Sequence, residues 1–165
     1  MSVETIALRA GVHKTTIYRR WHAKNRLVAE ALETAAETRI GTPDTGDVDE
    51  DLRALARGVL SSLTSREGAA AVRALVSGAE GSPEVRQIAQ RFWATRMAQV
   101  VPIVERAVER GQLPRGTSAA RVIEHIAAPL YYRLLVTGEP LSEADADLAA
   151  GAALAAARAG VFASA

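Results

Sequence analysis

Three hydrogen-bonding side chains, Lys14, Thr15 and Thr16, stand together in a segment whose chemistry suits contact with nucleic-acid bases. Lysine prefers the guanine acceptors of the major groove, and threonine hydroxyls can donate to or accept from base edges. Tyr18 and Arg19 follow and are suited to phosphate oxygens, which position a protein on a duplex without reading its sequence. The residue types therefore predict a surface that contacts nucleic acid.

Two short helices joined by a tight turn would position these side chains. Apolar residues recur at helical spacing through residues 3–10. Gly11 follows, where a helix often ends on a residue with positive φ. Ile17 and Trp21, four apart, give a second helix over residues 14–21 a narrow buried side. This is the layout of a helix-turn-helix, whose second helix enters the DNA major groove.

The charge of the chain is divided unevenly. Residues 1–29 contain six basic residues and one acid, a net charge of +5, and the remainder carries −4, for a total of +1. A basic head on an acidic body favours a polyanionic partner for the head. Lys24 lies near the start of a further helix expected over about 24–40. It adds a cation to the free N–H groups there and is a further candidate for phosphate contact.

The segment 2–28 resembles the DNA-binding motif of the tetracycline-repressor (TetR) family of bacterial regulators. The residues that carry the resemblance are Ala-Gly-Val at 10–12, Thr-Ile-Tyr at 16–18, Trp21, Lys24 and Leu27. In that family the positions of Tyr18 and Lys24 commonly contact the DNA backbone. The resemblance implies an all-α homodimeric repressor that binds double-stranded operator DNA and is released by a small-molecule effector.

One departure from the family keeps an alternative open. Members normally carry another helix before this motif, packed on both of its helices, whereas this sequence begins at Met1. We therefore expect Ile6, Ile17 and Trp21 to lose part of their cover, at a cost of about 1.5–3 kcal/mol for each side chain fully exposed. The alternative is a dimeric ligand-binding or interaction module that has lost DNA binding.

A linker divides the chain into two expected domains. Gly, Pro and Asp without periodicity fill residues 41–48. The expected division is a helix-turn-helix DNA-binding domain over 1–40 and an effector-binding and dimerisation domain over 47–165. Few aromatic residues, at 4%, and an Ala-rich composition favour helix. Apolar spacing and capping residues predict helices over about 49–64, 66–78, 83–110, 118–137 and 142–159.

Aromatic and large apolar residues on two adjacent helices of the body are candidates for an effector pocket. Basic residues and a histidine nearby are its candidate polar contacts. The candidate set is Arg73, Phe92, Trp93, Arg96, Met97, His125 and Tyr131. Ordinary core packing for the aromatic residues, and surface positions for the charged ones, remain the alternative. The two helices favour a hydrophobic or amphipathic ligand over a highly charged one.

The last two helices are apolar on more than one side, so more than one side must be covered. Small residues along the final helix permit close helix approach, and two such helices from each of two chains form a four-helix interface. The candidate interface residues are Leu134, Leu148, Ala152, Ala155, Ala156 and Ala159. Core packing within one subunit is the alternative.

The sequence offers little for catalysis. The three histidines, His13, His22 and His125, are scattered, and the chain contains no His-Glu-x-x-His, Walker or Gly-x-Ser-x-Gly motif. The absence of cysteine excludes thiolate metal sites and disulfides. We expect no enzymatic activity, no cofactor and no metal. No signal peptide or apolar run of membrane length is present, so the expected location is the cytoplasm.

Overall fold

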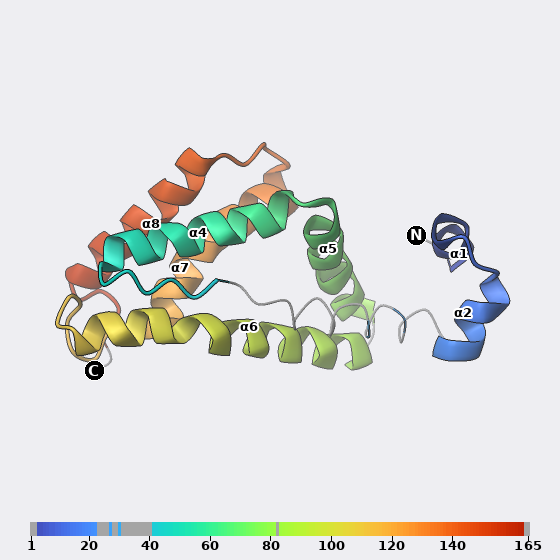
Figure 1. Cartoon of the computed structure of the whole chain (residues 1–165), viewed down its shortest axis with the longest axis horizontal. Helices are drawn as coiled ribbons and strands as arrows, with labels where there is room; N and C mark the ends of the chain where they lie inside the picture. The colour runs from blue at the N-terminus through green and yellow to red at the C-terminus, as the bar shows by residue number, and fades with distance from the viewer. Residues whose placement is uncertain (1–2, 23–26, 28–29, 31–40, 82, 164–165) are drawn as a thin grey trace.

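The computed structural model describes residues 3–22, 27, 30, 41–81 and 83–163, and within these residues every element is a helix (Figure 1). The elements are α1 (Val3–Ala10), α2 (Lys14–Trp21), α4 (Val48–Thr64), α5 (Arg66–Gly81), α6 (Pro83–Glu109), α7 (Ala119–Tyr132), the π-helix η1 (Arg133–Thr137) and α8 (Glu143–Arg158). The expected all-α class is confirmed. None of the described helices is long and apolar enough to cross a membrane.

The predicted helix-turn-helix forms as a small packed unit. Gly11 ends α1 with φ of 65°. Val3 and Ala7 of α1 enclose Ile17 of α2, which is only 4% exposed. The expected loss of cover is therefore partial, because Ile17 stays buried while Ile6 and Trp21 are half-buried at the edge of this cluster.

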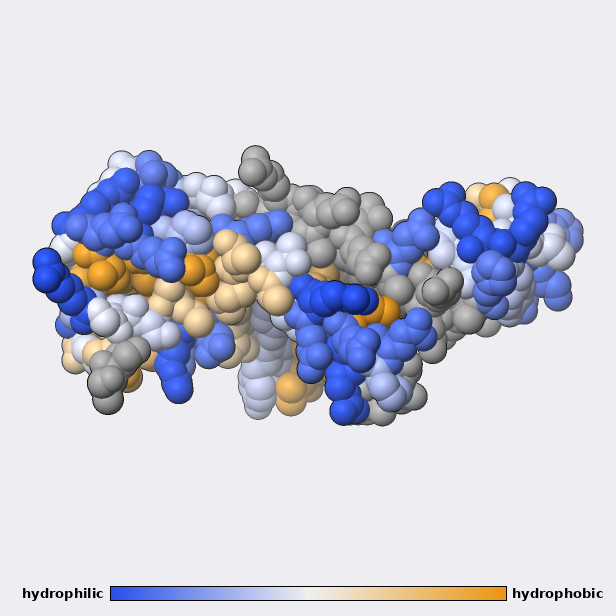
Figure 2. Space-filling view, turned by 90° about the horizontal axis from the view of Figure 1, so that it is seen from below, coloured by the Kyte–Doolittle hydropathy of each residue, from blue (hydrophilic) through white to orange (hydrophobic). Residues whose placement is uncertain are grey.

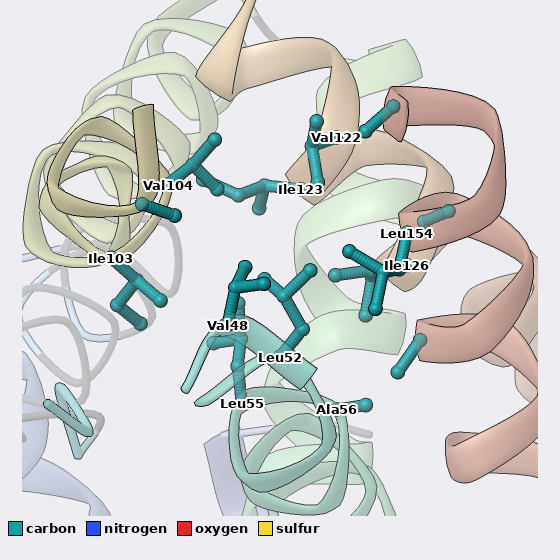
Figure 3. Close-up of a cluster of buried hydrophobic side chains, with 14 of the residues drawn as sticks. Val48, Leu52, Leu55, Ala56, Ile103, Val104, Val122, Ile123, Ile126 and Leu154 are labelled. Atoms are coloured by element: carbon teal, nitrogen blue, oxygen red, sulfur yellow. The ribbon is translucent and has the colours of Figure 1, made fainter. Parts of the chain in front are cut away.

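The core of the body lies between α4, α6, α7 and α8, whose apolar side chains point toward one another (Figure 3). Leu52 from α4, Val104 from α6 and Val122 from α7 are completely inaccessible to solvent. Burial of each such side chain contributes about 1.5–3 kcal/mol relative to exposure. In Figure 1, α4 and α8 lie side by side, and α5 crosses from the end of α4 to the N-terminal part of α6.

Helix ends in the body follow the capping residues. Ser142 and Asp145 form the predicted capping box at the start of α8, in which each side chain accepts a backbone N–H of the other residue. Ser118 caps α7. The segment predicted as one helix to Thr137 changes from α to π geometry after Tyr132 and ends at Gly138, whose φ of 69° stops it.

The linker is held against the body at two points. The buried carboxylate of Asp51, 2% exposed, accepts hydrogen bonds from the backbone N–H and the hydroxyl of Thr45, both at 2.9 Å. Asp44 pairs with Arg106 at 3.3 Å and with Arg110, both near the C-terminal end of α6. We call the group Asp44, Arg106 and Arg110 the linker clamp. The hydrogen bond from Arg110 and the charge of Arg106 hold the pKa of Asp44 below its ordinary value.

Candidate functional sites

The exposed side of α2 presents most of the predicted DNA-contacting residues together. These side chains all face solvent, while Ile17 between them faces α1: Lys14, Thr15, Thr16, Tyr18 and Arg19. Hydrophilic side chains cover most of this part of the molecule in Figure 2, on the right. The sixth predicted contact, Lys24, lies outside the described residues. An exposed helix with polar residues in its first turn has the shape and chemistry for a major groove.

The C-terminal end of α2 is used for internal contacts. Arg20 forms an ion pair with Glu30 at 2.9 Å, and its guanidinium lies 4.8 Å from the ring centroid of Trp21. The indole N–H of Trp21 donates to the second oxygen of Glu30 at 2.8 Å. These contacts tie α2 to the segment that follows and so help to fix its orientation.

A cavity of about 820 Å³, measured out to its open mouth, lies between four helices of the body. Most of the wall is apolar. The lining residues are Leu55, Val59 and Ser62 of α4, Gly68, Ala71 and Val72 of α5, Phe92, Trp93, Arg96, Met97 and Val100 of α6, and Ile123, Ala127 and Tyr131 of α7.

Aromatic rings pack against one another on one side of this cavity. Trp93 meets Phe92 edge-on at 4.9 Å and Tyr131 edge-on at 5.4 Å between ring centroids. The guanidinium of Arg96 lies 5.4 Å from the ring centroid of Phe92. Burial raises the pKa of Tyr131 to about 12, so its hydroxyl stays protonated and available as a donor. Burial also lowers the pKa of Arg96, yet arginine remains charged near neutral pH.

The structure brings five of the seven candidate pocket residues to this cavity: Phe92, Trp93, Arg96, Met97 and Tyr131. It does not bring Arg73 or His125 there. Arg73 is exposed on α5. His125 is exposed on α7, where its ring packs on Phe162 with centroids 4.6 Å apart and its Nδ1 lies 2.8 Å from the carbonyl oxygen of Arg121.

Sequence reasoning missed the contributions of α4 and α5 to the cavity. The helical spacing of Leu55 and Val59 was the available signal, but it predicts a helix without showing that these side chains border a cavity. Gly68 is needed for close approach, since a Cβ there would lie 2.0 Å from the carbonyl oxygen of Ser62. That proximity brings α5 against the end of α4 and closes this part of the wall.

Comparison with known proteins decides the family. Residues 42–153, more than half of the chain, match the family described as the tetracyclin repressor-like C-terminal domain. The chain belongs to the TetR family of transcriptional regulators. The family's members are transcriptional regulators.

Individual relatives of this TetR regulator agree. It is 30% identical over 143 residues to the uncharacterized HTH-type transcriptional regulator YdeS of Bacillus subtilis, covering 87% of this chain and 72% of YdeS. It is 34% identical over 118 residues to the regulator AqdR of Rhodococcus erythropolis, covering 72% of this chain and 56% of AqdR. Its fold matches the crystal structure of the TetR-family regulator SCO0332 with a TM-score of 0.73 and 28% identity, over 93% of this chain and 85% of that one.

The candidate dimer residues of this TetR regulator fall into two groups. Leu148 is 73% exposed, and Ala152, Ala155 and Ala159 are also exposed along α8. Leu134 and Ala156 are half-buried against clusters of their own subunit. Two further exposed apolar residues were not predicted as interface residues: Tyr132 at the end of α7 is 57% exposed, and Val136 in η1 is 68% exposed.

Proposed function

We propose that this TetR-family regulator is a homodimeric repressor that binds operator DNA through α2. A small molecule that fills the cavity between α4, α5, α6 and α7 releases it from the DNA. The proposal divides the chain into the DNA-binding head, residues 1–40, and the effector-binding and dimerisation body, residues 47–165. The observation that carries it is the pairing of an exposed polar face on α2 with a hollow, mostly apolar site in the body.

The first turn of α2 is the proposed site of contacts to base edges. Lys14, Thr15 and Thr16 are exposed where the N-terminal end of a recognition helix reaches base edges. Tyr18 and Arg19, one turn on, are placed to touch phosphates, as is Lys24 in the segment that follows α2.

Exposed apolar residues at the end of α7, in η1 and on α8 support the dimer, and we call them the apolar strip. Its large members are Tyr132, Val136 and Leu148, and α8 also exposes small residues that permit close packing. An isologous interface on this strip would cover them and hold two copies of α2 at a fixed separation, which matches a palindromic operator.

The linker clamp gives the cavity a physical connection to the head. α6 lines the cavity through Phe92, Arg96 and Met97. Near its far end, Arg106 of α6 and Arg110 just beyond the helix hold Asp44 of the linker. A ligand that favours one placement of α6 thereby favours one placement of the linker. This shifts the population of head spacings and weakens operator binding.

Titration against DNA tests the proposal directly. The full chain is titrated at two salt concentrations against the duplex flanking its own gene and against a scrambled duplex of equal length. We expect Lys14→Ala to cost about 1–3 kcal/mol and to relax sequence preference, because it removes a base contact. Arg19→Ala should weaken binding to both duplexes and lower the salt slope by about 1, because it removes a phosphate contact.

Two further variants complete this experiment. Arg115→Ala removes an exposed cation of the body and should leave both affinities unchanged. Leu148→Glu should produce a monomer in sedimentation and reduce operator affinity, since a charge replaces the most exposed apolar side chain of the strip. If the chain shows no preference between the two duplexes and Lys14→Ala changes nothing, the protein is instead a ligand-binding module without operator recognition.

A further inference from the structure

We propose that the effector is a neutral, mostly apolar molecule with one hydrogen-bond acceptor, such as a carbonyl oxygen, that binds to the hydroxyl of Tyr131. This inference rests on the proposed function, because it names the class of ligand for the same cavity. The position of Tyr131 in the wall and the chemistry of the residues around it carry the inference.

Tyr131 lines the cavity from α7 and is held in a defined orientation by its neighbours. Its ring meets Trp93 edge-on, with centroids 5.4 Å apart and ring planes at 83°, and Trp93 packs edge-on against Phe92 in turn. Among the residues that the structure describes, none forms a hydrogen bond with the hydroxyl of Tyr131. The half-buried tyrosine therefore offers a ligand one donor in a defined place.

The wall around this hydroxyl disfavours charge on the ligand. Burial raises the pKa of Tyr131 to about 12 and lowers the pKa of Arg96, so the surroundings favour the uncharged form at both positions. A charged group on a bound ligand would lose its hydration in the same surroundings. Arg96 takes part in other interactions, including the contact with the ring of Phe92, so we assign the polar contact to Tyr131.

The rest of the wall specifies the apolar part of the ligand. Leu55, Val59 and Ile123 offer aliphatic surface. The other uncharged polar side chain of the described lining, Ser62, is exposed to solvent. An alkyl or aryl group fills such a wall favourably, whereas a second polar group would lose its hydrogen bonds to water there. The ligand that fits is therefore apolar except at the acceptor that Tyr131 binds.

Four probes that share a phenyl ring and a four-carbon chain test the proposal: butyrophenone, butylbenzene, 4-phenylbutanoate and 4-phenylbutylammonium. They carry a carbonyl oxygen, no polar group, an anion and a cation, respectively. Binding to the full chain is measured by calorimetry. We expect butyrophenone to bind about tenfold or more tightly than either charged probe, because the charged probes lose hydration. Tyr131→Phe should weaken butyrophenone about two- to tenfold, the factor that a neutral hydrogen bond supplies, and leave butylbenzene unchanged.

Tyr132→Phe is the matched control, because it removes the same hydroxyl from the next residue of α7. Tyr132 is 57% exposed and lies outside the cavity lining. The substitution keeps the apolar ring that the proposed dimer uses and should leave all four affinities unchanged. Binding of butylbenzene to Tyr131→Phe shows in turn that the cavity of that variant is intact.

The proposal is overturned if no probe binds, if a charged probe binds as tightly as butyrophenone, or if Tyr131→Phe weakens butyrophenone no more than butylbenzene. A failure of the proposed function looks different: butyrophenone binds through Tyr131, but saturation with it leaves operator affinity unchanged.

Discussion

The long and short parts of α6, on either side of Pro102, differ in packing. Ahead of Pro102 the helix lines a cavity with Trp93, Arg96 and Met97, all half-buried. Beyond it, Ile103, Val104 and Ala107 are at most 2% exposed and pack in the core cluster shared with α4, α7 and α8. One helix therefore combines a hollow segment with a close-packed one.

This difference separates the part of α6 that a ligand would contact, under the proposed function, from the part that holds its shape. Close-packed interiors transmit displacement rather than absorb it. The close-packed part of α6 also carries Arg106 and is followed directly by Arg110, and both hold the linker through Asp44. Under the proposed function, a ligand in the cavity would contact a helix whose other part is fixed to the core and to the linker.

Shortening a side chain to alanine should show the difference in packing between the two parts of α6 most strongly. Ile103→Ala leaves a cavity in a region where neighbours are fixed, and we expect a loss of about 3–4 kcal/mol in the free energy of unfolding. Met97→Ala removes a half-buried side chain that already borders empty space, so we expect a loss below about 2 kcal/mol. Urea unfolding of the full chain measures both. Equal losses in the free energy of unfolding would mean that the two parts of α6 are packed alike.

Enlarging a side chain should also affect the two regions differently: it should destabilise the close-packed core and be tolerated at the cavity. Ala107 is 2% exposed in the core, so Ala107→Leu overpacks it and should cost about 1–3 kcal/mol. Ala127 of α7 faces the cavity, and Ala127→Leu should change stability by less than about 0.5 kcal/mol while filling space that a ligand needs. Urea unfolding of the two variants measures both changes. Strong destabilisation by Ala127→Leu would show that the cavity does not accept an added side chain.

Much of this architecture was predictable because local residue patterns encode it. The helix-turn-helix follows from apolar spacing, Gly11 and the pair Ile17 and Trp21, and the start of α8 follows from Ser142 and Asp145. These signals act within a few residues, so the sequence displays them directly. The pairing of Phe92 with Arg96 and of Trp93 with Met97 follows likewise, since residues four apart lie on the same side of a helix.

The rest depended on contacts between distant segments. The rotation of α5 and α7 about their axes is set by packing, so the sequence did not show that Arg73 and His125 face solvent away from the cavity. A cavity is a place where side chains fail to meet, and no residue pattern marks it. Asp44 and Arg110 are 66 positions apart, which is why a segment predicted only as a linker is held in place by contacts that the sequence did not reveal.

The smallest expected effect concerns the linker clamp and depends on pH. The pKa of Asp44 is lowered in the folded protein, first by the hydrogen bond from Arg110. Its contribution to stability is therefore complete above the ordinary value of 3.8 and is lost as the pH falls through the lower pKa of the folded state. We expect Asp44→Asn to be less stable than the parent chain near neutral pH and to approach it in acid, as measured by urea unfolding across this range. Arg110→Gln should abolish most of the same pH dependence, and combining the two substitutions should add little. A difference between parent and Asp44→Asn that stays constant with pH would show that the clamp does not depend on the charge of Asp44.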